Sequence, residues 1–198
     1  MRPQLIGGWL ALLLLAGPAG AAVLVPAELG ELAREARAIV HGRVVSVEGV
    51  WTAGRRSIET VVTIEVSAAL KGSPGREVSL RVPGGELGRY RSVVVGAPVF
   101  REGQEVVVFL GGGGPALPHL LGLGQGVYRV RRDPRSGLPM VTPPPVAGAA
   151  TAVRVQRGDP ARRTVTLEEF ARQVRAAMGG PGERERLAPR PVPGRGSR

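Results

Sequence analysis

Cysteine is absent from this chain of 198 residues. The absence excludes disulfides, thiol nucleophiles, zinc sites built on cysteine, CxxCH haem attachment and the cysteine-linked anchor of bacterial lipoproteins. Any folded part is therefore held together by packing alone. Histidine and aspartate are almost as scarce, because the chain has only His41, His119, Asp133 and Asp159.

The scarcity of these residues argues against most catalytic chemistry. His41 and His119 lie far apart in the sequence, and neither belongs to an HExxH pattern. Asp133 and Asp159 each precede a proline in turn-like sequence, which explains both as turn residues. The glycines of residues 111–115 lack the Lys-Ser or Lys-Thr of a phosphate loop, and no GxSxG elbow occurs. We therefore expect no catalytic residues, no cofactor and no metal.

Aromatic residues make up only 4% of the chain, and its formal net charge is +11. A single-stranded nucleic-acid site needs aromatic side chains inside a basic groove, and here the core needs most of them. We therefore expect no nucleic-acid partner. Of the 27 basic residues only Lys71 is a lysine, a bias typical of a GC-rich genome. The positive charge leaves open a role in binding an acidic polysaccharide or a lipid surface.

The first 21 residues have the composition of an export signal. Arg2 supplies a positive end, residues 5–16 are apolar, and the run ends at Pro18 and a small-residue AGA sequence. About a dozen apolar residues are fewer than the roughly 20 that span a bilayer. We expect cleavage before Ala22, export to the periplasm, the cell surface or the medium, and no membrane span afterwards. The alternative is a signal retained as an anchor.

The pattern after the signal predicts a short amphipathic helix and then mainly strands. Apolar residues at helical spacing favour a helix over residues 26–36. Residues 58–70 alternate with a period of two, and the alternation in the preceding segment changes phase, which predicts a β-bulge near Val44. The predicted strands are residues 39–51, 58–70, 78–82, 89–95 and 105–110, followed by a hairpin of residues 126–132 and 138–141.

A spacer and a second helix follow. Residues 142–165 are rich in proline and glycine and have room for a short strand at 152–156. A helix is predicted over residues 166–179, with Thr166 as its N-cap and Glu169 reaching back as in a capping box. Residues 180–198 are basic, contain little to bury and are expected to be disordered. The fold class predicted for residues 22–141 is mainly β, a small antiparallel β-barrel or sandwich, with a helix at each end.

The order of these features resembles a loose group of bacterial exported proteins of unassigned function. The resemblance rests on AIVHGRVVSVE, ETVVTIEVSAALKG, PGGELG, GAPVFREGQEVVVFL and GLGQGVYRV, and it covers residues 26–130. The order of a strand, a long strand, LKG and then F-x-x-G-x-x-x-x-x-F-L is also similar to the netrin-like, OB-type barrel of the tissue inhibitors of metalloproteases. That resemblance implies an inhibitory or docking module. The cysteines that those inhibitors use to chelate zinc and brace the barrel are missing here, so the inhibitory mechanism is not expected.

These observations favour an exported, non-enzymatic module that binds a protein or an envelope polymer. Loops carry function on rigid scaffolds, so we expect contact through residues 52–56, 83–89 and 111–119. One alternative is an envelope hydrolase that uses His41 or His119. Another is a basic protein that binds acidic polysaccharide or lipid. The residues predicted to contact the partner are Arg55, Arg56, Glu86, Arg89 and His119.

Overall fold

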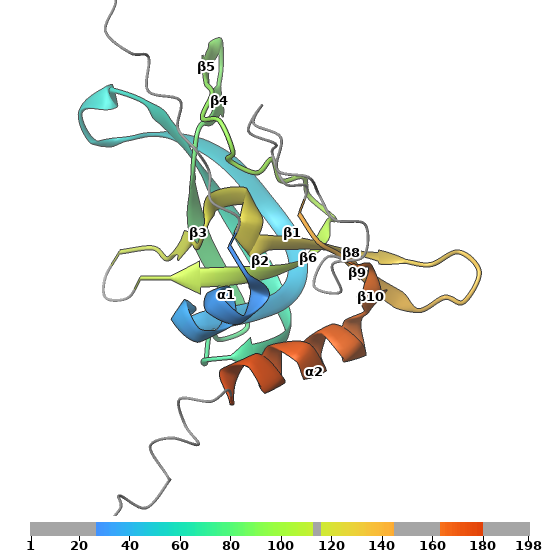
Figure 1. Cartoon of the computed structure of the whole chain (residues 1–198). Coiled ribbons are helices and arrows are strands. Elements are labelled where there is room, and N and C mark those ends of the chain that lie inside the picture. The colour runs from blue at the N-terminus through green and yellow to red at the C-terminus, as the bar shows by residue number, and fades with distance from the viewer. Residues whose placement is uncertain (1–26, 113–115, 145–162, 180–198) are drawn as a thin grey trace, which may run out of the picture.

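The computed structural model describes residues 27–112, 116–144 and 163–179. The chain is mainly β, with a short helix near the start of the described residues and a longer one at their end (Figure 1). The elements are α1 (Leu29–Glu35), β1 (Ala38–Trp51), the 3-10 turn η2 (Ala53–Arg55), β2 (Ile58–Lys71), β3 (Glu77–Pro83), β4 (Gly85–Leu87), β5 (Tyr90–Ser92), β6 (Glu105–Gly111), β7 (His119–Leu120), η3 (Leu123–Gly126), β8 (Val127–Arg132), β9 (Pro139–Thr142), β10 (Val165–Thr166) and α2 (Leu167–Met178).

Several predicted features lie outside the described residues. They are the signal peptide of residues 1–21, the tail of residues 180–198, the short strand at 152–156 and the turn at Asp159. Within the described residues, the prediction of a mainly β fold with a helix near each end is confirmed.

Eight strands form one mixed sheet in the order β1-β2-β3-β7-β6-β8-β9-β10. Because β1 also pairs with β6, the strands β1, β2, β3, β7 and β6 form a partial ring. The prediction of a wholly antiparallel arrangement is wrong at one point, since β3 and β7 pair in parallel through Arg81 and His119. The chain reverses after β6 to enter β7, and this reversal gives β7 the direction of β3.

Strand β1 pairs with both β2 and β6 because it bends. Residues 38–43 pair with β6 on one edge, while the strand pairs with β2 along almost its whole length. The predicted bulge near Val44 is confirmed, because the register passes from Val44 to Ser46 and leaves Val45 unpaired. The strand also shifts register at Gly42, where an added Cβ would lie 2.2 Å from the carbonyl oxygen of Glu65. Glycine therefore permits the close crossing that bends β1.

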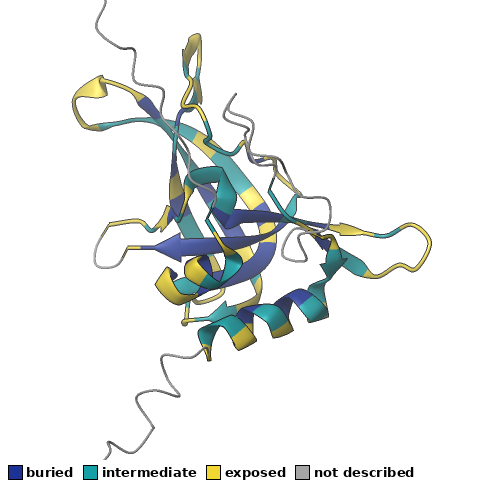
Figure 2. Ribbon diagram, viewed as in Figure 1, coloured by how far each residue is buried: buried dark blue, intermediate teal, exposed yellow. Residues whose placement is uncertain are grey.

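Two apolar clusters lie on opposite faces of the sheet, and β6 contributes to both (Figure 2). Val106, Val108 and Leu110 belong to the cluster inside the partial ring, together with Phe100, which the sequence predicted to be a core residue. The alternate residues of β6 face the helices. That outer cluster contains Leu32, Ala33, Ala36, Ile39, Val107, Phe109, Tyr128, Val130, Val141, Phe170 and Val174.

Helix α2 is anchored by aromatic packing and by its predicted N-cap. The ring centre of Phe170 lies 4.8 Å from that of Tyr128 and 6.4 Å from that of Phe109. The hydroxyl of Thr166 accepts a hydrogen bond from the backbone N–H of Glu169, which confirms the cap. The Glu169 carboxylate accepts hydrogen bonds from Arg172 and Gln173. It therefore bonds to later residues of the helix, and not back to the N-cap as the capping box predicted. The bond from Arg172 lowers the pKa of Glu169.

The region predicted as a loop and then a strand is organised differently. Residues 83–88 were predicted to be a loop, but β4 within them pairs with β5 around a turn in which Gly88 has φ +60°. Strand β5 ends at Ser92, so the strand predicted for residues 89–95 is wrong for its last three residues. The reason is a tight turn in which the N–H of Ala97 donates to the carbonyl of Val94, with Gly96 at φ +85°.

The predicted hairpin of β8 and β9 is confirmed. Its turn begins at Asp133, whose carboxylate accepts hydrogen bonds from the Ser136 hydroxyl and from the backbone N–H groups of Arg135 and Ser136. These bonds, that of the Ser136 hydroxyl first, lower the pKa of Asp133. Asp133 is therefore a turn residue, as its position before a proline predicted.

Replacing Gly42 should test the crossing of β1 and β2. We expect Gly42→Ala to lower the free energy of unfolding by about 1–3 kcal/mol, because the new Cβ overlaps backbone that has no room to move. Gly30→Ala in α1 is the control. There a Cβ would meet the flexible end of Arg34 at 3.2 Å and the Cβ of Ala177 at an ordinary contact distance of 4.0 Å, so a gain of about 0.5–1 kcal/mol is expected. Urea unfolding measures both, and equal effects of the two variants would contradict the crossing.

Lys71 should stabilise the end of α1. Its Nζ donates to the carbonyl oxygens of Ala33 and Arg34, both at 2.9 Å, where the helix leaves its last carbonyls unsatisfied. Lys71→Met should lower the free energy of unfolding by about 1–2 kcal/mol. The exposed Arg76→Met, which removes the same charge nearby, should change it by less than about 0.5 kcal/mol. A loss no larger than that of Arg76→Met would show that Lys71 does not cap α1.

Candidate binding site

Two of the three predicted contact loops come together. The rings of Trp51, beside the β1–β2 turn, and Tyr90, in the β4–β5 hairpin, have centres 5.4 Å apart and meet edge to face. An added Cβ on Gly49 would lie 2.0 Å from the carbonyl oxygen of Glu86, so β4 lies directly on β1. Both hairpins project from the upper side of the molecule in Figure 1. The structure thus brings residues 52–56 and 83–89 to one end.

The predicted contact residues at this end are all exposed or partly exposed. Arg55 and Arg56 lie at the tip of the β1–β2 turn, where Arg55 has a φ of +53°. Glu86 forms an ion pair with Arg91 at 3.2 Å, and both side chains are about 70% exposed, so the pair contributes little to stability. Arg89 lies 5.1 Å from the centre of the Tyr90 ring and donates to its hydroxyl at 3.0 Å.

The third predicted loop lies at the other end of β1. Gly111 and Gly112 line a pocket of about 400 Å³ together with Ala38, the first residue of β1. Residues 113–115 lie outside the described residues. His119 is exposed, pairs with Arg81 and Gly111, and does not adjoin the two hairpins. The three loops therefore do not form one surface.

An apolar segment that the sequence did not single out lies beside the hairpins. In this apolar segment, residues 93–99, Val93 is 73% exposed, Val95 is 89% exposed and Val99 is 66% exposed. Val95 stands at the tip of the turn closed by Ala97 and Val94. The run of valines favours a strand, so the sequence did not identify this segment as an exposed surface. The following Gly-Ala-Pro is typical of a turn.

A groove separates the apolar segment from the β4–β5 hairpin. The mouth groove, as we call it, has a volume of about 430 Å³ and opens above the apolar interior of the partial ring, where Phe100 is buried. Its polar side chains are Thr60 of β2, Glu86 of β4, and Arg91 and Ser92 of β5. The groove is lined by Val47, Gly49, Thr60, Pro83, Gly84, Gly85, Glu86, Arg91, Ser92, Val93, Val94, Ala97, Pro98, Val99 and Phe100.

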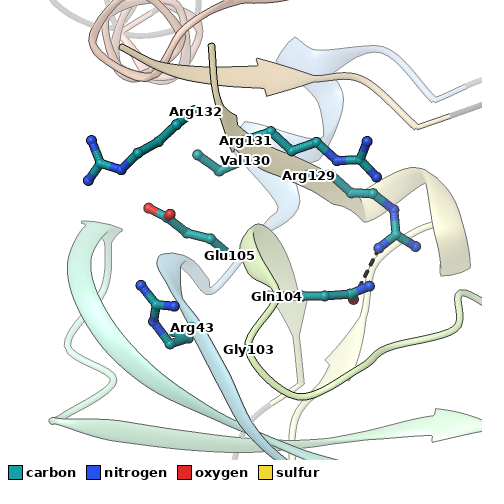
Figure 3. Close-up of a pocket in the computed structure, with 8 residues that line it drawn as sticks. All are labelled: Arg43, Gly103, Gln104, Glu105, Arg129, Val130, Arg131 and Arg132. Carbon is teal, nitrogen blue, oxygen red and sulfur yellow. Dashed lines mark hydrogen bonds between the residues drawn. The ribbon is translucent and has the colours of Figure 1, made fainter. Parts of the chain in front are cut away.

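A second pocket is lined by arginines. The arginine pocket, of about 360 Å³, lies where β1, β6 and β8 meet, and its lining residues are Arg43, Gly103, Gln104, Glu105, Arg129, Val130, Arg131 and Arg132. Figure 3 shows the Glu105 carboxylate between the side chains of Arg43 and Arg132, whereas Arg129 and Arg131 extend to the other side. Arg129 is held in place, because it donates to Oε1 of Gln104 and to the carbonyl oxygen of Val99, both at 3.1 Å.

His41 lies next to this pocket and binds the same carboxylate. Its Nε2 is 2.8 Å from Oε1 of Glu105, and the residue is only 8% exposed. An imidazole with a carboxylate is two thirds of a catalytic triad, but a nucleophile must contact the other imidazole nitrogen. In the part of the chain that the structure describes, Glu105 is the one hydrogen-bond partner of the His41 side chain. The pair joins β1 to β6.

The two histidines do not share a site. His41 pairs with Val107 on one edge of β6, and His119 pairs with Gly111 on the other edge. Among residues 27–112, 116–144 and 163–179, no three histidine, aspartate or glutamate side chains lie close enough to hold a metal ion. Glu105 could not be identified from the sequence as the partner of His41, because only the β1–β6 register brings the two together.

Removing the imidazoles should separate a structural role from a catalytic one. His41→Ala should lower the free energy of unfolding by about 1–3 kcal/mol, because Glu105 loses its partner at a partly buried position. His119→Ala, at an exposed position, should change it by less than about 0.5 kcal/mol. Urea unfolding measures both effects. The opposite ranking, with His119→Ala the more damaging variant, would contradict this assignment.

Three comparisons with known proteins complete the description of the site. No family model matches the chain, and neither a curated protein nor a solved structure matches it. No helix among the described residues is both long enough and apolar enough to cross a bilayer.

Proposed function

We propose that this chain is an exported, non-enzymatic binding module of the cell envelope or extracellular space, and that it docks a protein partner. Its contact surface is the apolar segment together with the mouth groove and the two neighbouring hairpins. The exposure of Val93, Val95 and Val99 is the observation that carries this proposal. Clustered exposed aliphatic side chains next to a groove are typical of interaction sites, whereas single exposed valines need no explanation.

The fold that presents this surface is proposed to be an OB-type, netrin-like β-barrel. The order β1-β2-β3-β7-β6-β1, the bulged first strand and the apolar interior support this proposal. A ring of paired strands holds its end loops rigidly, so a partner binds a surface that is already formed. The proposed export rests on residues 1–21 of the sequence.

The dimensions and chemistry of the mouth groove favour a polypeptide as the partner. A cavity of about 430 Å³ accepts a few aliphatic side chains from an extended segment or a loop. Gly84 and Gly85 leave one side of the groove without side chains, and the Thr60 hydroxyl fixes this side by donating to the carbonyl oxygen of Gly84 at 2.7 Å. Arg91, Glu86 and Ser92 provide polar groups at the rim, the usual arrangement around an apolar interface centre.

A charge placed on the apolar segment should abolish docking. Val95→Asp should reduce recovery of the partner at least about tenfold, because burying a valine contributes roughly 1.5–3 kcal/mol and a buried carboxylate costs more. The control is Leu138→Asp in the β8–β9 turn, where the side chain is also 50% exposed. The measurement is affinity capture of the tagged protein, with quantitative mass spectrometry, after export in its own host.

The outcomes of this capture decide the proposal. Recovery of the same partner with the unaltered protein and Leu138→Asp, but not with Val95→Asp, supports docking through the apolar segment. Equal recovery with Val95→Asp contradicts the assigned surface. Recovery of polysaccharide or lipid without any protein contradicts a protein partner.

A further inference from the structure

We propose that the arginine pocket binds an anionic sugar, one that carries a carboxylate or phosphate group beside free hydroxyls. This binding site shares no lining residue with the mouth groove of the protein-docking surface proposed above. The inference starts from an imbalance of charge. Four arginines line the pocket, and Glu105 is the one acidic residue among the lining residues. The Glu105 carboxylate is already hydrogen-bonded to His41.

The arginines are not neutralised by acidic neighbours. Within the described ranges, Arg43, Arg131 and Arg132 form no ion pair with any carboxylate. Glu65 lies opposite Arg43 in the β1–β2 register, but no oxygen–nitrogen distance between them is within 4.0 Å. Asp133 follows Arg132 in the chain and is engaged by Ser136. Unpaired guanidinium groups around a concave surface attract an anion.

The pocket is also partly organised before a ligand arrives. Two hydrogen bonds hold Arg129, one to Gln104 and one to the carbonyl of Val99. Arg132 donates to the carbonyl oxygen of Gly137 at 3.3 Å. The paired strands β1, β6 and β8 fix the positions from which the arginines project. Guanidinium groups that are already placed lose less conformational entropy when they bind a carboxylate or phosphate.

Glu105 determines what kind of anion suits the pocket. Figure 3 places its carboxylate between Arg43 and Arg132, so a bare anion entering there meets a negative charge as well as two positive ones. A carboxylate accepts hydrogen bonds from hydroxyl groups and donates none. A ligand with hydroxyls next to its anionic group therefore satisfies Glu105 and the arginines together. Sugar acids and sugar phosphates have this arrangement.

The lining residues argue against nucleobases and neutral sugars as the ligand. Not one aromatic side chain lines the arginine pocket, so bases and neutral sugars find no stacking surface. Its volume of about 360 Å³ lies within the range of small-molecule sites, roughly 300–1,000 Å³. The one apolar side chain among the lining residues, Val130, is buried, so the side chains that face the pocket are those of the arginines, Gln104 and Glu105.

The test compares two pairs of arginines that carry the same charge. The variant Arg43→Gln with Arg132→Gln alters the pocket, and the control Arg55→Gln with Arg56→Gln removes the same charge from the exposed β1–β2 turn. Isothermal titration calorimetry at a fixed ionic strength measures binding of trigalacturonic acid, maltotriose and inorganic phosphate. Anionic phospholipid vesicles are tested separately by sedimentation. Urea unfolding verifies that each variant remains folded, and the single variants Arg43→Gln and Arg55→Gln replace the two pairs if one does not.

We expect trigalacturonic acid to bind more tightly than phosphate and maltotriose not to bind. The pocket variant should weaken binding at least about tenfold and the turn variant less than about twofold. If both variants weakened binding equally, the overall charge of the protein would explain the binding, and the proposal would be overturned. It would also be overturned if phosphate bound as tightly as the sugar acid, or if only the vesicles bound. None of these results depends on the capture experiment at the apolar segment.

Discussion

Strand β6 is buried on both faces, and the rest of the structure is arranged around that constraint. Val106, Val107, Val108 and Phe109 have no exposed surface, and Leu110 is 1% exposed. Alternate residues fill the partial ring on one side and pack under α1 and α2 on the other. A strand of this kind admits no polar side chain along its length, because a buried polar group without a partner costs more than packing returns. The one polar side chain of the strand, that of Glu105, accordingly stands at its start.

The start of β6 positions the two surfaces to which we assign functions. Glu105 begins the strand, holds His41 and forms part of the arginine pocket. The segment that leads into β6 carries the exposed valines and the buried Phe100. The two surfaces meet at Arg129, which lines the pocket and donates to the carbonyl of Val99 in the apolar segment. The apolar segment and the cationic pocket are thus both positioned by the same buried strand.

Local patterns in the sequence were enough to predict the two helices and the long strands. The period of two in residues 58–70, the change of phase near Val44 and the Thr166 cap each depend on residues close together in the chain, and each is confirmed. The apolar sequence of residues 105–110 likewise indicated a central strand. What failed locally was the run of three valines at residues 93–95. Their strand propensity is overridden by the Gly96 turn and by the lack of a neighbouring strand.

The candidate sites were harder to predict because they depend on long-range register. Nothing near His41 in the sequence points to Glu105. Arg43 and Arg132 line the same pocket only because β6 lies between β1 and β8. Gly111 and Gly112 lie away from the two hairpins because of the direction of β6, which ends beside the start of β1. A shift of one residue in any of these pairings would move every one of these side chains to the other face.

Native-state hydrogen exchange of the backbone amides tests the central role of β6 most directly. If β6 links the interior of the partial ring to the helix layer, the amides of Val106 to Leu110 exchange only through global unfolding, and those of Phe170 and Val174 in α2 open with nearly the same free energy. Exchange of β6 amides through local opening, well below the global free energy of unfolding, would contradict this account. So would an α2 that opens freely while β6 stays protected.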